Sequence, residues 1–365
     1  MSLPYLQPYL GLSNGLNTLH AAGAGGIGGW VELARTTLGS ASETLEVTGI
    51  ADKRYLMYLI DGRPVSSEFQ TVLQTGNSSF DTGSNYSSRA SNNGGADSTQ
   101  TSFPYARLSP STSLSDLFVV GYIANYSTKE KLGQSQSVKR ETSGSANAPQ
   151  RMEHIWKWTN TSNVIDRLRI NENGTGTINT NSEMVVLGWD PADTHTNNFW
   201  EELASVDLSG GAATSLSSGN FTSKKYLWVQ GYIEHSGAAG YGIMRVGNSS
   251  VDTGSNYATR VSFDGGADAT YTSQTSYPYI LGNGAGPAVF EGFFNMFIIN
   301  NASNEKLIIA HNNFFYTTVG PTNAGQRHEL AMKWANTSNQ IDIIELSRTS
   351  GNLGTNTSIK VWGSD

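Results

Sequence analysis

The sequence Asp81-Thr-Gly-Ser-Asn-Tyr-Ser-Ser-Arg-Ala-Ser-Asn-Asn-Gly-Gly-Ala-Asp-Ser-Thr99 returns 171 residues later as Asp252-Thr-Gly-Ser-Asn-Tyr-Ala-Thr-Arg-Val-Ser-Phe-Asp-Gly-Gly-Ala-Asp-Ala-Thr270. Most of the nineteen positions are identical in the two stretches. Solenoid and propeller repeats have periods of about 20–50 residues. A period of 171 residues is much longer and predicts a duplicated domain instead.

The similarity extends to both sides of this stretch, at an offset that stays between 170 and 176 residues. The matching pairs are Trp30–Leu33 with Trp200–Leu203, Lys53–Leu56 with Lys224–Leu227, Gln150-Arg151 with Gln326-Arg327, Lys157-Trp158 with Lys333-Trp334, and Asn160–Asn163 with Asn336–Asn339. Two units of roughly 150–170 residues are each large enough to bury a core. We therefore predict a first domain at residues 30–190, a linker at 191–198 and a second domain at 199–365.

Residues 1–29 have no counterpart in the second copy and are rich in glycine, especially at 21–29. Fixing glycine costs more backbone entropy than fixing any other residue, so order here would need an external contact. We predict an N-terminal arm that anchors the chain to a neighbouring subunit or a larger assembly.

Apolar residues alternate with polar ones or form short runs in each copy, which is the pattern of β-strands. In the first copy the predicted strands are Leu45–Val47, Tyr55–Ile60, Val72-Leu73, Leu117–Ile123, Val164–Ile170 and Met184–Leu187. Turn-forming clusters separate them, at Asp61-Gly62, Gly76–Ser79, Asn92–Gly95, Ser143–Ser145 and Asn171–Gly174. These features predict an all-β chain of two tandem β-sandwich domains of jelly-roll type.

Composition excludes several classes of function. The formal net charge is −7 and only 15% of residues are charged, with no basic run. Nucleic acids and anionic membranes are bound chiefly by clustered Lys and Arg, so we expect neither as a partner. The chain has no cysteine, and its six histidines are not paired at metal-ligand spacing, so we expect no metal centre and no cofactor.

The two Asp-Thr-Gly-Ser sequences resemble those of aspartic proteases, which would pair Asp81 with Asp252 over one shared proton. Such a dyad needs apolar flanks that shift the two pKa values apart. Polar segments flank the first copy instead, at Gly76–Ser79 and Asn85–Arg89. We therefore expect no enzyme, no catalytic residue, and an Asx turn in which each carboxylate accepts backbone N–H groups.

A calcium loop is a further alternative for the same stretch, using Asp81, Asn85 and Asp97, with Asp252, Asn256 and Asp268 in the second copy. Calcium requires six to eight oxygen ligands, and the EF-hand pattern is absent. The spacing leaves this alternative open.

The aromatic residues have two interpretations. Trp158 and Trp334 lie in alternating segments, so we predict that they belong to the core, together with Trp30 and Trp200. Rings beside amide side chains could instead bind sugars, as in a carbohydrate-binding module for host attachment. The candidate sugar-binding residues are Asn85-Tyr86 and Phe103–Tyr105, with copies at Asn256-Tyr257 and Tyr277–Tyr279.

Four segments resemble duplicated β-rich proteins of marine tailed bacteriophages: Trp30–Leu38, Gly83–Arg89, Asn147–Arg151 and Val185–Asp190. The resemblance covers nearly the whole chain after residue 29. It implies a non-enzymatic virion structural protein on the particle surface, such as a capsid decoration, head fibre or tail fibre subunit. We expect it to contact other virion proteins through residues 1–29 and to form a homo-oligomer, with a host glycan as the alternative partner.

Overall fold

The computed structural model describes residues 29–65, 70–110, 115–173, 176–191, 193, 197–236, 240–282, 290–316 and 324–365. These ranges contain 27 β-strands and no helix, and therefore no helix long enough to cross a membrane. The predicted all-β fold is confirmed. The predicted anchoring arm and part of the predicted 191–198 linker lie outside the described residues.

The N-terminal half, strands β1–β13, forms two antiparallel sheets. The large sheet has the order β1 (Val31–Thr37), β13 (Glu183–Trp189), β3 (Tyr55–Gly62), β9 (Leu117–Ala124), β10 (Lys131–Lys139), β11 (Gln150–Trp158), β6 (Tyr86–Asn92) and β7 (Ser98–Phe103). The small sheet has the order β2 (Thr44–Thr48), β12 (Arg167–Glu172), β4 (Thr71–Asn77) and β5 (Ser79–Phe80), with β8 (Ala106–Arg107) also paired to β4.

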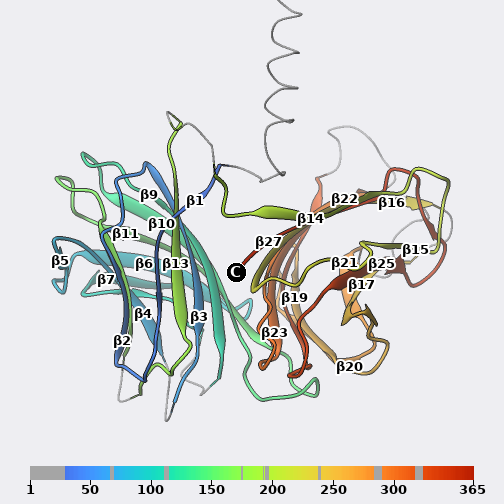
Figure 1. Ribbon diagram of the computed structural model, residues 1–365, viewed down its shortest axis with the longest axis horizontal. Coiled ribbons are helices and arrows are strands. Elements are labelled where there is room, and N and C mark those ends of the chain that lie inside the picture. Colours follow the sequence, from blue (N-terminus) through green and yellow to red (C-terminus); the bar gives the residue numbers. More distant parts are fainter. Residues whose placement is uncertain are drawn as a thin grey trace, which may run out of the picture.

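The C-terminal half, strands β14–β27, has sheets with the corresponding strand order (Figure 1). Its large sheet runs β14 (Glu201–Asp207), β27 (Ser358–Ser364), β16 (Tyr226–Ser236), β22 (Phe290–Ile299), β23 (Lys306–Tyr316), β24 (Gln326–Trp334), β19 (Tyr257–Phe263) and β20 (Ala269–Gln274), with β26 (Asn352–Leu353) paired to β16. Its small sheet runs β15 (Ser215–Ser217), β25 (Ile343–Arg348), β17 (Gly242–Asn248) and β18 (Ser250–Val251), with β21 (Tyr277–Leu281) paired to β17.

Each large sheet has an inner face, which packs on its own small sheet, and an outer face. Strand β3 shows how the alternation divides the side chains: Leu56, Tyr58 and Ile60 point into the sandwich core, whereas Met57 and Leu59 point to the outer face. The same alternation builds the core of the C-terminal sandwich. Because successive strand residues point to opposite faces, both faces of these central strands are apolar and buried.

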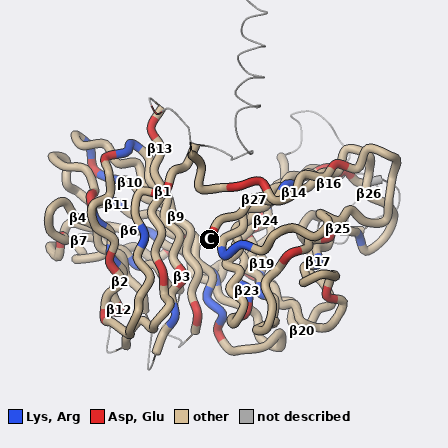
Figure 2. The backbone as a smooth tube through the Cα atoms, viewed as in Figure 1, with Lys and Arg blue, Asp and Glu red and all other residues tan. Residues whose placement is uncertain are grey.

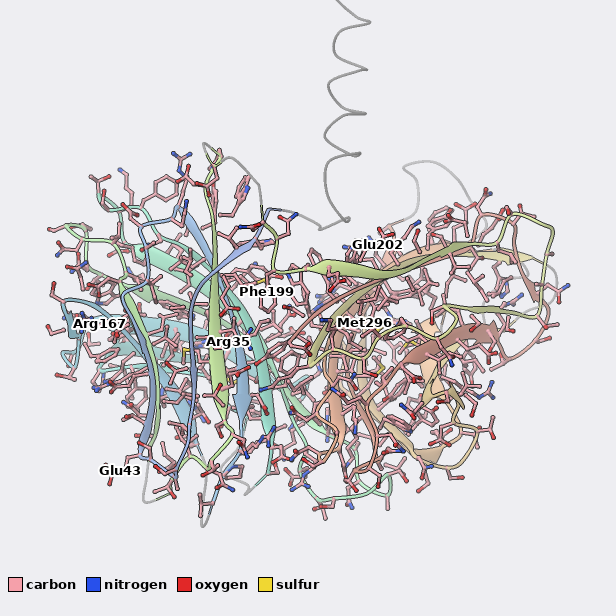
Figure 3. All side chains as sticks on the ribbon, viewed as in Figure 1. Arg35, Glu43, Arg167, Phe199, Glu202 and Met296 are labelled. Atoms are coloured by element: carbon pink, nitrogen blue, oxygen red, sulfur yellow. The ribbon has the colours of Figure 1, made fainter. Side chains whose placement is uncertain are left out.

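The outer faces of the two large sheets meet in a third apolar cluster, which joins the halves into one body. In Figure 1 the N-terminal half lies at the left, the C-terminal half at the right, and the C-terminus between them. Phe118 on β9 contacts Tyr226 on β16 across this junction, with ring centroids 6.5 Å apart. Figure 3 shows Arg35 and Phe199 at the same junction, where the guanidinium lies 5.9 Å from the centroid of the ring.

Several predicted boundaries were wrong, including Gly76-Asn77 and Asn171-Glu172, which were predicted as turns and continue β4 and β12. Asp61 and Gly62, predicted as a turn, continue β3, because Asp61 pairs with both β13 and β9 and Gly62 pairs with β9. The strand predicted from residue 164 begins only at Arg167, since the Asn125 side chain accepts the backbone N–H of Ile165 at 2.7 Å. This side-chain acceptor replaces a sheet partner.

Candidate functional site

The repeated Asp residues cap turns in their own halves. Asp81 Oδ1 accepts the backbone N–H of Gly83 at 2.8 Å, and Oδ2 accepts the indole N–H of Trp158 at 2.7 Å. Asp252 makes the same bonds to Gly254 and Trp334, each at 2.7 Å. Each carboxylate thus accepts hydrogen bonds from an Asx turn and from a core indole in its own half. In a protease dyad the two carboxylates would instead pair with each other.

In this structure, Asp97 and Asp268, which the calcium alternative includes, each form an ion pair with an arginine. Asp97 pairs with Arg89 at 3.4 Å, and Asp268 pairs with Arg151 of the other half at 2.7 Å. Among the described residues, no group of three or more His, Cys, Asp or Glu side chains could hold a metal ion.

Three of the six aromatic residues proposed for sugar stacking are in the core, and the other three are half-buried. Tyr86, Tyr257 and Tyr277 are fully buried, and the Tyr86 hydroxyl donates to the backbone carbonyl of Thr75 at 3.0 Å. These rings are inaccessible to a ligand. Their alternation places them on the inner face, so the sugar-binding assignment to them is corrected to a core role.

Trp158, Trp334 and Trp200 are buried as predicted, whereas Trp30 is only partly buried. Trp30 lines a groove of about 840 Å³ on the outer face of the N-terminal large sheet, at the end where β3 begins and β9 ends. We call this feature the outer-face groove. Its main apolar residues are Trp30, Tyr55, Tyr122, Leu132, Ile155 and Trp189. Its main polar residues are Ser87, Arg89, Thr99, Thr101, Gln134 and Lys157.

The rings of the groove support one another from neighbouring strands. Tyr55 on β3 stacks on Trp189 of β13, with centroids 5.4 Å apart, and Trp30 contacts Tyr122 of β9 at 6.2 Å. Leu132 on β10 and Ile155 on β11 lie beside them and are more than half exposed. Large apolar side chains exposed together at this scale are typical of a binding surface.

The polar residues of the groove are cations, amides and hydroxyls. Lys157 pairs with Glu130 at 2.9 Å outside the groove, while Arg89 pairs with Asp97 at its edge. The described lining includes no carboxylate and no imidazole. The groove therefore offers apolar contact and hydrogen-bond donors, which suits binding.

Sequence reasoning missed Tyr55, Tyr122, Leu132 and Ile155 as surface residues. The signal was present in one strand: Ile155 lies between His154 and Trp156, so it points to the face opposite the core tryptophans. Alternation therefore places Ile155 on the outer face, but it does not show whether that face is covered.

A cluster of charges flanks the junction between the halves. Arg151 donates to both carboxylate oxygens of Asp268, at 2.7 and 3.0 Å, and lies 2.6 Å from Glu153 and 3.4 Å from Glu329. Burial and the neighbouring Glu153 raise the pKa of Glu329. Burial alone would raise the pKa of Glu153, but the hydrogen bond with His311 and the charge of Arg151 hold that pKa below its usual value. Most of the backbone in Figure 2 belongs to uncharged residues, so this cluster is a local feature.

No protein-family model and no curated protein sequence matches the chain. Among solved structures it is similar to domains LG4-5 of the mouse laminin alpha1 chain, at 10% identity and a TM-score of 0.21, covering 93% of this chain and 91% of that chain. Neisserial surface protein A is similar at 8% identity and a TM-score of 0.13, with 84% and 98% covered. Pseudomonas aeruginosa OpdQ is similar at 7% identity and a TM-score of 0.12, with 85% and 98% covered.

Proposed function

We propose that this chain is a non-enzymatic structural subunit of a virion surface, attached to the particle through residues 1–29. The observation that carries the proposal is the use of the outer sheet faces for protein packing. One such contact joins the halves, and an apolar groove continues from it across the N-terminal sheet. The resemblance to bacteriophage structural proteins and the structural use of Asp81 and Asp252 support the same role.

Deleting residues 1–29 tests the attachment. We expect the truncated chain to keep its β-sheet circular dichroism and its thermal unfolding, because both sandwich cores lie after residue 29. We expect it to be lost from purified particles when it replaces the full chain during assembly. The matched control is a chain of full length in which residues 1–29 are kept and Val65, an exposed side chain, is changed to Asp. Normal incorporation of the truncated chain would contradict the proposal.

The carbohydrate-binding alternative is best placed at the outer-face groove, since three of the tyrosines first assigned to it, Tyr86, Tyr257 and Tyr277, are in the core. Stacked rings beside amides and hydroxyls could hold a sugar. In the C-terminal half, however, the equivalent surface is covered by protein. A sugar and a protein segment are therefore the two candidate occupants of the groove.

A further inference from the structure

The groove residues occupy the same register positions as residues that the C-terminal half buries. Tyr55 faces Ala124 on β9 and Trp189 on β13, and Tyr226 faces Ile299 on β22 and Ser364 on β27. The registers of the neighbouring strands identify equivalent residues across the rest of the sheet. Further counterparts are Tyr122 with Phe297, Leu132 with Leu307, and Ile155 with Ala331.

The two sets of counterparts differ in what covers them. Leu132 in the groove is 58% exposed, whereas Leu307 is 1% exposed. The C-terminal residues are buried in the third cluster, against the outer face of the N-terminal half. The equivalent surface is therefore covered by protein in the C-terminal half and left open in the N-terminal half.

The covering residues come from the opposite end of the N-terminal sheet. Phe118, at the start of β9, packs on Tyr226, and Asp61, near the end of β3, lies 3.5 Å from Lys225. One end of the N-terminal outer face thus contacts the other end of the C-terminal outer face. A head-to-tail contact of this kind leaves one copy of each surface unused, and repeating it builds a ring or a filament.

The second unused surface lies on the C-terminal half. Phe293 on β22 is the counterpart of Phe118 and is 41% exposed, although a core strand carries it. Arg327 is the counterpart of Arg151, and its side chain is 58% exposed. Asp97, the counterpart of Asp268, is 50% exposed at the edge of the groove. The two free surfaces therefore complement each other in both charge and apolar residues.

We propose that the outer-face groove binds a second copy of this chain, which inserts the Phe293 end of its C-terminal sheet. Phe293 of the second copy packs on Tyr55, and Arg327 of the second copy pairs with Asp97, as Phe118 packs on Tyr226 and Arg151 pairs with Asp268 within one chain. The groove continues from the junction between the halves, since Trp30 and Tyr122 belong to both. The inference deepens the proposed structural role by naming the partner.

Light scattering on the full chain tests association. We expect a concentration-dependent oligomer, and we expect Ile155→Asp to weaken it about 100-fold, because the charge would enter an apolar contact. Val65→Asp changes an exposed apolar residue elsewhere and should leave association unchanged. Asp97→Arg and Arg327→Asp should each weaken association about tenfold, and the double variant should restore it.

Crosslinking tests the geometry, because the chain has no cysteine of its own. A mixture of Tyr55→Cys chains with Phe293→Cys chains should form disulfide-linked dimers on mild oxidation. A mixture in which Val65→Cys replaces Tyr55→Cys should not. Equal yields from the two mixtures would overturn the inference.

Three further results would overturn the proposal: a monomer at every concentration, an Ile155→Asp oligomer as strong as the natural one, or a glycan-array signal of the monomer that Ile155→Asp removes. The last result would assign the groove to a carbohydrate. A monomeric chain that still enters particles would refute this inference alone, whereas normal incorporation without residues 1–29 would refute the proposed function alone.

Discussion

At the scale of single residues, the first residue of the repeated stretch is a carboxylate that serves two needs. Trp158 is large and buried, and its indole N–H requires an acceptor inside the fold. Asp81 supplies that acceptor and also closes its own turn by accepting the N–H of Gly83. The second copy repeats the arrangement with Asp252 and Trp334. The identity of the two stretches at this turn therefore reflects turn and core chemistry.

Buried histidines make stability depend on pH. Burial lowers the pKa of His154 to about 3 and that of His328 to about 4, so both are neutral in the fold near pH 5. In the unfolded chain histidine titrates near pH 6.5, so protonation favours unfolding as the pH falls below that value. Each histidine should remove about 2 kcal/mol of unfolding free energy between pH 7 and pH 5.

Urea denaturation of the natural chain and of His328→Gln at both pH values measures this effect. Glutamine can still donate to the carbonyl of Tyr279, which His328 Nδ1 contacts at 2.9 Å. The variant should lose about 2 kcal/mol less than the natural chain on acidification, since one titrating group is gone. An identical loss in both proteins would disprove a neutral His328 in the fold.

At the scale of elements, two equivalent hairpins have the same turn but different neighbours. Asn93-Gly94 and Asp264-Gly265 both have positive φ at the two central positions, as in the type I′ turn that joins two strands tightly. A side chain on Gly94 would meet Asp268 of the other half, whereas one on Gly265 would meet only the end of the Arg327 side chain. The two turns are alike, but only the first lies against the junction.

Replacing each glycine by alanine separates these effects. Both variants should lose about 1–2 kcal/mol, because a Cβ disfavours positive φ. Gly94→Ala should lose more than Gly265→Ala, because Asp268 is fixed by Arg151 and cannot move away. Thermal unfolding of the two variants measures the difference. Equal losses would show that the junction tolerates the added methyl group.

The sequence predicts the strands better than it predicts the groove. The short apolar runs Leu117–Ile123 and Met184–Leu187 correspond to β9 and β13, because a run of this length between turn-forming residues is a local property of the chain. Leu132 and Leu307 follow the same Glu-Lys pair in the sequence and face the same side of their sheets, yet one is exposed and the other buried. What covers an outer face is decided by packing between the halves, and no local pattern records it.

At the scale of the whole molecule, the charged cluster at the junction couples the halves. The Arg151 side chain is almost fully buried, and it neutralises both Asp268 and Glu329 of the C-terminal half. Taking charges out of water is costly, so the cluster is stable only while every member keeps its partner. Its counterpart Arg327, facing Glu329 from the same strand, is solvent-exposed.

Arg151→Ala should therefore lower the unfolding free energy by about 3–5 kcal/mol, because it leaves two carboxylates buried near each other without their cation. Arg327→Ala is the matched control, and it should cost less than about 1 kcal/mol because its ion pair is at the surface. Since Arg151 bridges the halves, its loss should also split the urea unfolding curve into two transitions, one for each sandwich core. A single transition with a cost equal to that of Arg327→Ala would mean that the apolar cluster alone holds the halves together.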